Sequence, residues 1–126
     1  MIVGLGIDGV EIVRFADWPG YSKTRLSQVF SEQEINYSLS VPIKAAERFS
    51  ARFAAKEAAY KALAHLMPTQ ISLIFFCKFV SVSNNAGGAP SLIVDFAQLQ
   101  LDPALKLSIS LSHTADLALA VVIAEL

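Results

Sequence analysis

Two acidic residues far apart in the sequence, Asp8 and Glu57, have side chains that could do chemistry. Asp8 interrupts an apolar, β-branched run, where an acidic residue is disfavoured unless it is hydrogen-bonded at a bend or binds a ligand. Glu57 precedes Lys61 by four residues, a spacing that on an ordinary helix favours a surface ion pair. Here the surrounding segment is apolar, which favours a functional role for Glu57 and Lys61 over a simple surface ion pair. Because Mg²⁺ takes one or two protein carboxylates together with waters and phosphate oxygens, Asp8, Glu57 and Lys61 could hold Mg²⁺ beside a phosphate.

Other motifs give weaker signals. Residues 4–9 match the dinucleotide pattern G-x-G-x-x-G, but Asp8 would place a negative charge where a pyrophosphate should lie. The run also continues as a strand, so its glycines indicate close backbone approach instead. No zinc cluster, phosphate-binding loop or serine-nucleophile motif occurs. His113 continues an apolar strand face, and Cys77 is expected to be a core residue.

The elements that must position these side chains predict a mixed α+β fold. A strand is expected over 2–13, and Ser31 and Glu34 form a capping box that begins a helix, with Phe30 and Ile35 at the positions of a hydrophobic staple. We assign no chemistry to those four residues. Further strands are expected over 71–83, 91–96, 106–112 and 117–125, with a hairpin loop at 113–116.

The longest predicted element is a helix over 43–67, which contains no glycine or proline. It has small residues on one side and large apolar residues on the other, so we expect it to be covered nearly all round. Its charges then need partners, because burying an unpaired charge is costly. These charges are Arg48, Arg52, Lys56, Glu57 and Lys61.

Composition restricts the class of protein. The 126 residues predict a single domain over 1–126, and the 54% hydrophobic and 17% charged content favours an obligate oligomer. A net charge of −1 disfavours a nucleic-acid partner. One cysteine fits a reducing, cytoplasmic location. The apolar run from Leu117 to Ala124 is far shorter than the ~20 residues needed to span a bilayer, so we expect no membrane association.

Three segments resemble the small bacterial holo-[acyl-carrier-protein] synthases, a family of 4′-phosphopantetheinyl transferases. They are Gly6-Ile7-Asp8-Gly9-Val10-Glu11-Ile12 with Arg14-Phe15, Arg52-Phe53-Ala54-Ala55-Lys56-Glu57-Ala58 with Lys61-Ala62, and Ile109-Ser110-Leu111-Ser112-His113-Thr114. The resemblance implies the fold of that family, a long central helix packed on a mainly antiparallel sheet. It also implies an enzyme of fatty acid biosynthesis that transfers the 4′-phosphopantetheine arm of coenzyme A to a serine of apo acyl carrier protein.

The same resemblance implies roles for individual residues. Asp8 and Glu57 would be Mg²⁺ ligands, and Glu57 and Lys61 would be catalytic, with Lys61 on the phosphates. Coenzyme A would be bound by Arg52, Lys61 and His113, and Arg14 would lie near the surface that docks the carrier protein. The family also implies a homotrimer with sites between subunits.

One segment departs from the family pattern. After Lys61-Ala62-Leu63 the family has a Gly-Thr-Gly type loop near the coenzyme, whereas this chain has residues 64–70 without a glycine. Two alternatives to a transferase therefore stay open. One is a non-catalytic relative that binds a carrier protein or a nucleotide, and the other is a structural oligomer whose charges form ion pairs.

Overall fold

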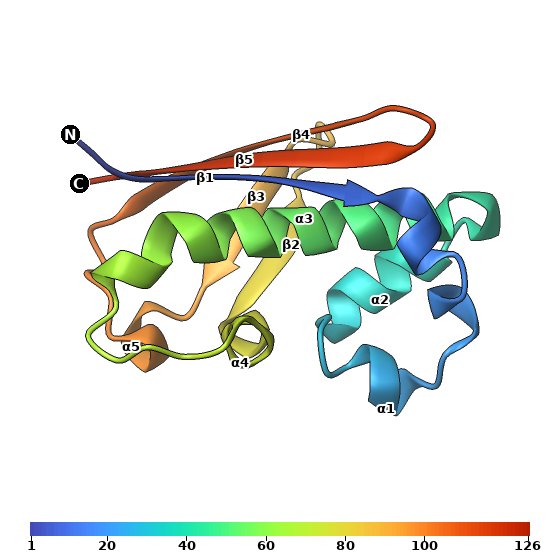
Figure 1. Ribbon diagram of the computed structural model, residues 1–126, viewed down its shortest axis with the longest axis horizontal. Coiled ribbons are helices and arrows are strands. Elements are labelled where there is room, and N and C mark those ends of the chain that lie inside the picture. The colour runs from blue at the N-terminus through green and yellow to red at the C-terminus, as the bar shows by residue number, and fades with distance from the viewer.

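In the computed structural model, which describes residues 1–126, one long helix lies against a three-stranded sheet (Figure 1). The short helices lie on the side of this helix away from the sheet. The strands are β1 (Ile2–Glu11), β2 (Val80–Asn84), β3 (Pro90–Val94), β4 (Lys106–His113) and β5 (Leu117–Glu125). The helices are α1 (Lys23–Leu26), α2 (Glu32–Leu39), α3 (Ala45–Leu63), α4 (Leu73–Phe76) and α5 (Phe96–Leu99). This arrangement confirms the predicted α+β fold.

The three-stranded sheet is antiparallel with the order β1-β5-β4, so β1 is an edge strand. A second sheet is the β2–β3 hairpin. The face of the larger sheet that meets α3 is lined by small residues. A Cβ atom added at Gly4 would lie 2.1 Å from the Ala62 carbonyl oxygen, and one added at Gly6 would lie 1.9 Å from that of Ala58. The prediction that these glycines permit close backbone approach is confirmed.

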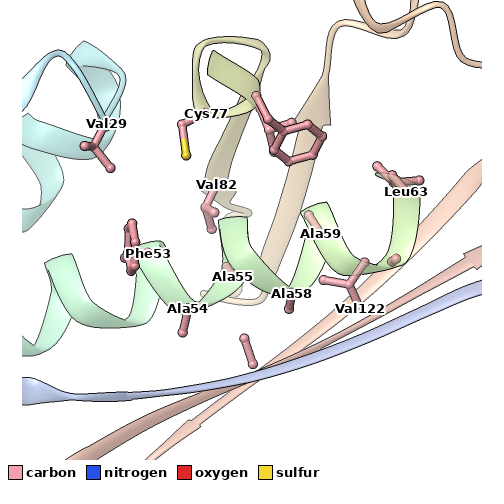
Figure 2. Packing of buried hydrophobic residues seen from close by; sticks show 14 of the residues in the cluster. Val29, Phe53, Ala54, Ala55, Ala58, Ala59, Leu63, Cys77, Val82 and Val122 are labelled. Carbon is pink, nitrogen blue, oxygen red and sulfur yellow. The ribbon is translucent and has the colours of Figure 1, made fainter. Parts of the chain in front are cut away.

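Helix α3 is covered on nearly all sides, as its apolar pattern predicted. Figure 2 shows Ala54 and Ala58 directed at β1, while Val82 and Cys77 lie on the opposite side of the helix. These side chains belong to a cluster of 25 buried apolar residues. The predicted burial of Cys77 is confirmed. Helix α3 lies between the three-stranded sheet on one side and the short helices and β2 on the other. Side chains at successive positions of α3 therefore contact different elements.

The start of α2 follows the predicted capping box. The Glu34 amide donates to Ser31 Oγ at 3.2 Å, and the Ser31 amide donates to Glu34 Oε1 at 2.8 Å. Phe30 and Ile35 are both buried. The strands predicted over 106–112 and 117–125 are also present, the first extended by His113.

Several predicted boundaries are wrong. The first strand ends at Glu11 and is followed by a 3₁₀ turn, Ile12–Phe15, and the predicted helix over 43–67 is α3 flanked by two 3₁₀ turns. The predicted strand over 71–83 is helical from Leu73 to Phe79, because Ser72 Oγ caps the Phe75 amide at 3.1 Å. The strand predicted over 91–96 ends at Val94, because Asp95 caps α5.

The sheet face turned away from α3 is apolar and partly exposed. It carries Leu5 and Ile7, which are 64% and 66% exposed, beside Leu119, Val121 and Ile123 of β5. Polar serines of β4 border this face. None of the helices combines the length and the apolar character that crossing a membrane requires.

Candidate active site

The fold brings Asp8, Glu57 and Lys61 together. Asp8 follows Gly4 and Gly6 at two-residue spacing, so its side chain lies on the face of β1 that meets α3. Lys61 Nζ donates to Asp8 Oδ1 at 3.1 Å and to the Ile7 carbonyl at 3.0 Å. Lys61 thus pairs with Asp8, and the ion pair with Glu57 that the helical spacing could have formed is absent.

Glu57 lies beside Asp8 and is strongly affected by it. Partial burial and the neighbouring Asp8 carboxyl group raise the pKa of Glu57 to about 7, against the opposing charges of Lys61 and Arg14. Two neighbouring carboxyl groups cannot both ionise cheaply unless a cation lies close to them.

The donor set around Asp8 fits a hard divalent cation. Asp8 is nearly buried, and its Oδ2 atom has no hydrogen-bond partner. An orphaned carboxylate oxygen next to a second carboxyl group is the arrangement expected of a Mg²⁺ site completed by waters and phosphate oxygens. No group of three or more His, Cys, Asp or Glu side chains that could hold a metal ion occurs.

A second group of predicted residues lines a cavity of about 280 Å³. Arg52 and His113 both reach it, from α3 and from the end of β4, and Lys44 and Arg48 add two further cations. Glu47 is the acidic residue of this lining, and its Oε1 atom is 3.1 Å from His113 Nε2. The predominantly basic lining suits an anionic ligand.

Arg52 is held rigidly in this cavity. Its guanidinium carbon lies 3.9 Å from the centre of the Tyr37 ring, and one of its NH₂ groups donates to Asn84 Oδ1 at 2.8 Å. Burial lowers the pKa of Arg52. The Nε atom is buried without a partner, which leaves one donor of a buried cation unsatisfied.

His113 does not pack into the core as a histidine ending an apolar strand face often does. Its side chain is 53% exposed at the cavity rim. His113, which the sequence placed at the start of the hairpin loop, is the last residue of β4, and its partner is Glu47. Lys44 and Glu47 belong to no motif that indicates a site, although Lys44, Arg48 and Arg52 recur at the four-residue spacing of one helix face.

Arg14 lies in the 3₁₀ turn that follows β1, exposed to solvent. Its guanidinium carbon is 5.9 Å from the centre of the Phe53 ring. Its charge lowers the pKa of Glu57, opposing the larger upward shift, so Arg14 is close enough to act electrostatically on the carboxyl pair.

The segment without glycine leaves α3 through a 3₁₀ turn, Ala64–Leu66. His65 Nε2 lies 2.8 Å from the Val3 carbonyl oxygen, so this turn is fastened to the edge of β1. Lys61 makes the equivalent contact with Ile7 one helical turn earlier.

Comparisons with known proteins cover nearly the whole chain. A sequence model of the 4′-phosphopantetheinyl transferase superfamily matches residues 4–122. The chain is 40% identical over 131 residues to a holo-[acyl-carrier-protein] synthase of Treponema denticola and 36% identical over 129 residues to one of Koribacter versatilis. Each of these matches covers 99% of this chain and 99% of the relative.

Solved structures agree with the sequences. A Bacillus anthracis holo-(acyl-carrier-protein) synthase in complex with coenzyme A (3′,5′-ADP) superposes with a TM-score of 0.76 at 29% identity, covering 98% of this chain and 96% of that one. The Mycobacterium tuberculosis acyl carrier protein synthase gives a TM-score of 0.74 at 29% identity, covering 99% of this chain and 98% of that one.

Proposed function

This chain belongs to the 4′-phosphopantetheinyl transferase superfamily, and we propose that it transfers the 4′-phosphopantetheine group of coenzyme A to a serine of apo acyl carrier protein. The second product is adenosine 3′,5′-bisphosphate. The relatives that match over 99% of the chain carry out the synthesis of holo-acyl carrier protein. The observation that carries the proposal is the convergence of Asp8, Glu57 and Lys61 on one point between β1 and α3.

Asp8 and Glu57 would hold Mg²⁺ in this reaction. The unpartnered Asp8 Oδ2 and the raised pKa of Glu57 both support a cation at this point. When bound, Mg²⁺ would polarise the pyrophosphate of coenzyme A and neutralise charge on the leaving phosphate. The protein would supply only two ligands, which leaves coordination positions for the substrate.

Lys61 would act directly on the phosphates. The serine oxygen forms a bond to the phosphorus that carries the pantetheine arm, the phosphoanhydride bond to the adenosine bisphosphate breaks, and the serine proton passes to a base. The Lys61 ammonium group lies 3.1 Å from Asp8 Oδ1, beside the proposed metal site. From there it would stabilise the negative charge that develops on the leaving phosphate. Phosphoryl transfer depends mainly on such positioning and charge stabilisation.

The basic cavity would take the adenosine end of coenzyme A. Arg52 and His113 belong to the same lining, and the unsatisfied Arg52 Nε supports an anionic ligand there. On α3, Arg52 precedes Glu57 by five residues, about 7.5 Å along the helix axis. That spacing lets one extended coenzyme reach both the cavity and the carboxyl pair.

Arg14 would help to dock the carrier protein. The family's carrier proteins are acidic, and this chain is nearly neutral overall, so attraction must be local. Lys23 is already paired with Glu32 at 3.3 Å, which leaves Arg14 and Arg25 as the free cations of the 14–25 segment. A carrier held at Arg14 would present its serine close to Asp8 and Glu57. We place the transfer reaction in the cytoplasm, where the free Cys77 would stay reduced.

We further propose that the chain acts as one domain and assembles as a homotrimer with sites at the subunit interfaces. The apolar outer face of the sheet, with Leu5 and Ile7 about two thirds exposed, supports packing against another copy. Replacing Ile7 by Lys should produce monomers in sedimentation experiments. A wild-type monomer at micromolar concentration would contradict the assembly.

Mass spectrometry of an apo carrier protein tests the activity. After incubation with this protein, coenzyme A and Mg²⁺, the carrier should gain the mass of phosphopantetheine, and a chelator should prevent the gain. Asp8→Asn and Glu57→Gln should abolish transfer without unfolding the protein. Binding of coenzyme A or carrier without any mass gain would instead favour the non-catalytic alternative. Full activity in excess chelator would contradict the metal assignment.

A further inference from the structure

Lys56 and Glu34 form a buried ion pair that the proposed reaction does not use. Lys56 Nζ lies 2.6 Å from Glu34 Oε1, and both side chains are 0% exposed. Lys56 Nζ also donates to the carbonyls of Val29 at 2.7 Å and Cys77 at 3.4 Å. Replacing a buried pair by well-packed apolar residues is often neutral or stabilising. Stability alone therefore does not explain why these two charges lie inside the protein.

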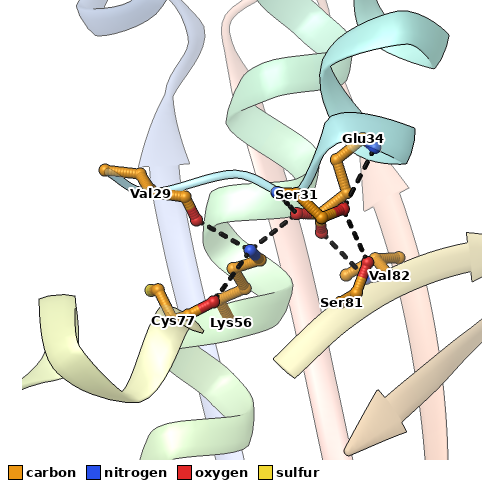
Figure 3. Close-up of polar contacts among 7 residues, drawn as sticks. All are labelled: Val29, Ser31, Glu34, Lys56, Cys77, Ser81 and Val82. Atoms are coloured by element: carbon orange, nitrogen blue, oxygen red, sulfur yellow. Dashed lines mark hydrogen bonds and ion pairs between the residues drawn. The ribbon is translucent and has the colours of Figure 1, made fainter. Parts of the chain in front are cut away.

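Glu34 extends this pair into a cluster that joins three elements (Figure 3). Its Oε1 atom accepts from the Ser31 amide and its Oε2 atom accepts from the Val82 amide, each at 2.8 Å. Ser31 Oγ lies 2.8 Å from Ser81 Oγ. The start of α2, the middle of α3 and strand β2 are thus connected by directional contacts.

The cluster contacts α3 on a different side from the candidate active site. Successive residues of an α-helix point about 100° apart. Lys56 points towards α2 and β2, whereas Glu57 points towards Asp8 on β1. Rotating α3 enough to break the pair would therefore also move the Glu57 carboxyl away from Asp8.

Arg52 is connected to the same cluster. It lies four residues before Lys56, so both are on one side of α3. Burial lowers the pKa of Arg52, and the negative charge of Glu34 opposes that shift, which places Glu34 within electrostatic reach of the cavity. Along α3, Lys56 therefore lies between Arg52, which is assigned to coenzyme binding, and Glu57, which is assigned to the metal.

We propose that Lys56 and Glu34 are positioning residues for the transfer reaction. Their buried pair sets the rotation of α3 between α2 and β2, and so fixes Glu57 against Asp8 while keeping Arg52 in its cavity. This inference rests on the proposed transferase function. Misplacing a reacting group by about 1 Å can cost ~10²-fold in rate, so a small rotation is sufficient for a large effect.

The double substitution Glu34→Gln with Lys56→Met tests this role, because it removes both charges at similar side-chain size. The folded double variant should show a turnover reduced by about 10-fold or more and a raised half-saturating Mg²⁺ concentration. The KM for the carrier protein should not change, because Arg14 lies outside the cluster. Leu99→Ala is the control, because Leu99 is buried in α5, which is separated from α2 by α4 (Figure 1).

Each outcome is decisive. A folded double variant with wild-type turnover and wild-type Mg²⁺ dependence overturns the positioning role. An equal loss of turnover in Leu99→Ala also overturns it, because the effect would then follow stability alone. If the double variant does not fold, Glu34→Asp serves instead, because it keeps both charges but moves the carboxylate away from Lys56. An unchanged Mg²⁺ dependence of turnover in this variant overturns the proposal. A wild-type protein that transfers nothing refutes the proposed function instead.

Discussion

Replacing Gly6 by alanine should separate the Asp8 and Glu57 carboxyl groups without changing either residue. A Cβ atom at Gly6 would lie 1.9 Å from the Ala58 carbonyl oxygen and 2.9 Å from the Ala62 nitrogen. The first distance is about 1.5 Å shorter than ordinary van der Waals contact. Both neighbours are helix backbone and cannot rotate away, so β1 must move away from α3 by a comparable amount.

That movement reaches Asp8, which is two residues farther along the same face of β1. Its partners, Glu57 and Lys61, directly precede Ala58 and Ala62 and stay with the helix. A separation on the order of 1 Å should reduce turnover by ~10²-fold. The overpacked contact should also lower the free energy of unfolding by ~1–3 kcal/mol.

Transfer kinetics and thermal unfolding of the same preparations measure both effects. Gly9→Ala is the control on the same strand, because a Cβ there meets only side-chain atoms, Leu119 Cδ2 at 3.2 Å and Leu117 Cδ1 at 3.9 Å, and both side chains can shift. It should retain nearly wild-type turnover. Wild-type turnover in a folded Gly6→Ala protein would refute the claim that close packing of β1 on α3 sets the site geometry.

Three further substitutions probe individual charges. Since the pKa of Glu57 is raised from 4.5 to about 7, the metal-free fold loses stability as the pH rises between these values. Glu57→Gln should therefore raise the Tm in chelator at about pH 8 and leave it nearly unchanged at about pH 5; equal shifts at both would contradict this assignment. Lys61→Ala should lower turnover more than Mg²⁺ affinity, and normal turnover would reduce Lys61 to an ion-pair partner of Asp8. Arg14→Glu should raise the KM for the carrier protein but not for coenzyme A, and high salt should narrow its difference from wild type; unchanged carrier kinetics at every salt concentration would make Arg14 a solvated loop residue.

The convergence of Asp8, Glu57 and Lys61 could be predicted from the sequence because local periodicity governs it. Two-residue spacing places Gly4, Gly6 and Asp8 on one strand face, and four-residue spacing places Glu57 and Lys61 on one helix face. Small residues on both elements then allow these faces to meet.

The basic cavity and the buried pair depend on contacts that periodicity does not encode. The cavity forms only where the end of β4 meets the first turns of α3, so Glu47 could not be assigned to His113 in advance. Glu34 already had a role in the capping box. A carboxylate has two oxygens and several acceptor sites, however. The Glu34 carboxylate therefore also pairs with Lys56 and accepts a hydrogen bond from the Val82 amide.

The segment from Leu73 to Phe79 shows a different reason for failure. Its apolar and aromatic residues suit a strand, but the Ser72 cap favours a helical turn. In a short apolar run, the cap decides between two conformations that bury similar side chains.

The side-chain contacts along the edge of β1 also determine how this sheet can meet other chains. An exposed strand edge is normally a template for a further strand and a route to aggregation. Here the carbonyls of Val3 and Ile7 already accept from His65 and Lys61, and α3 lies along the strand. A foreign strand would have to displace both side chains before it could pair. The sheet can therefore keep an exposed apolar face while its open edge is closed to indefinite sheet extension.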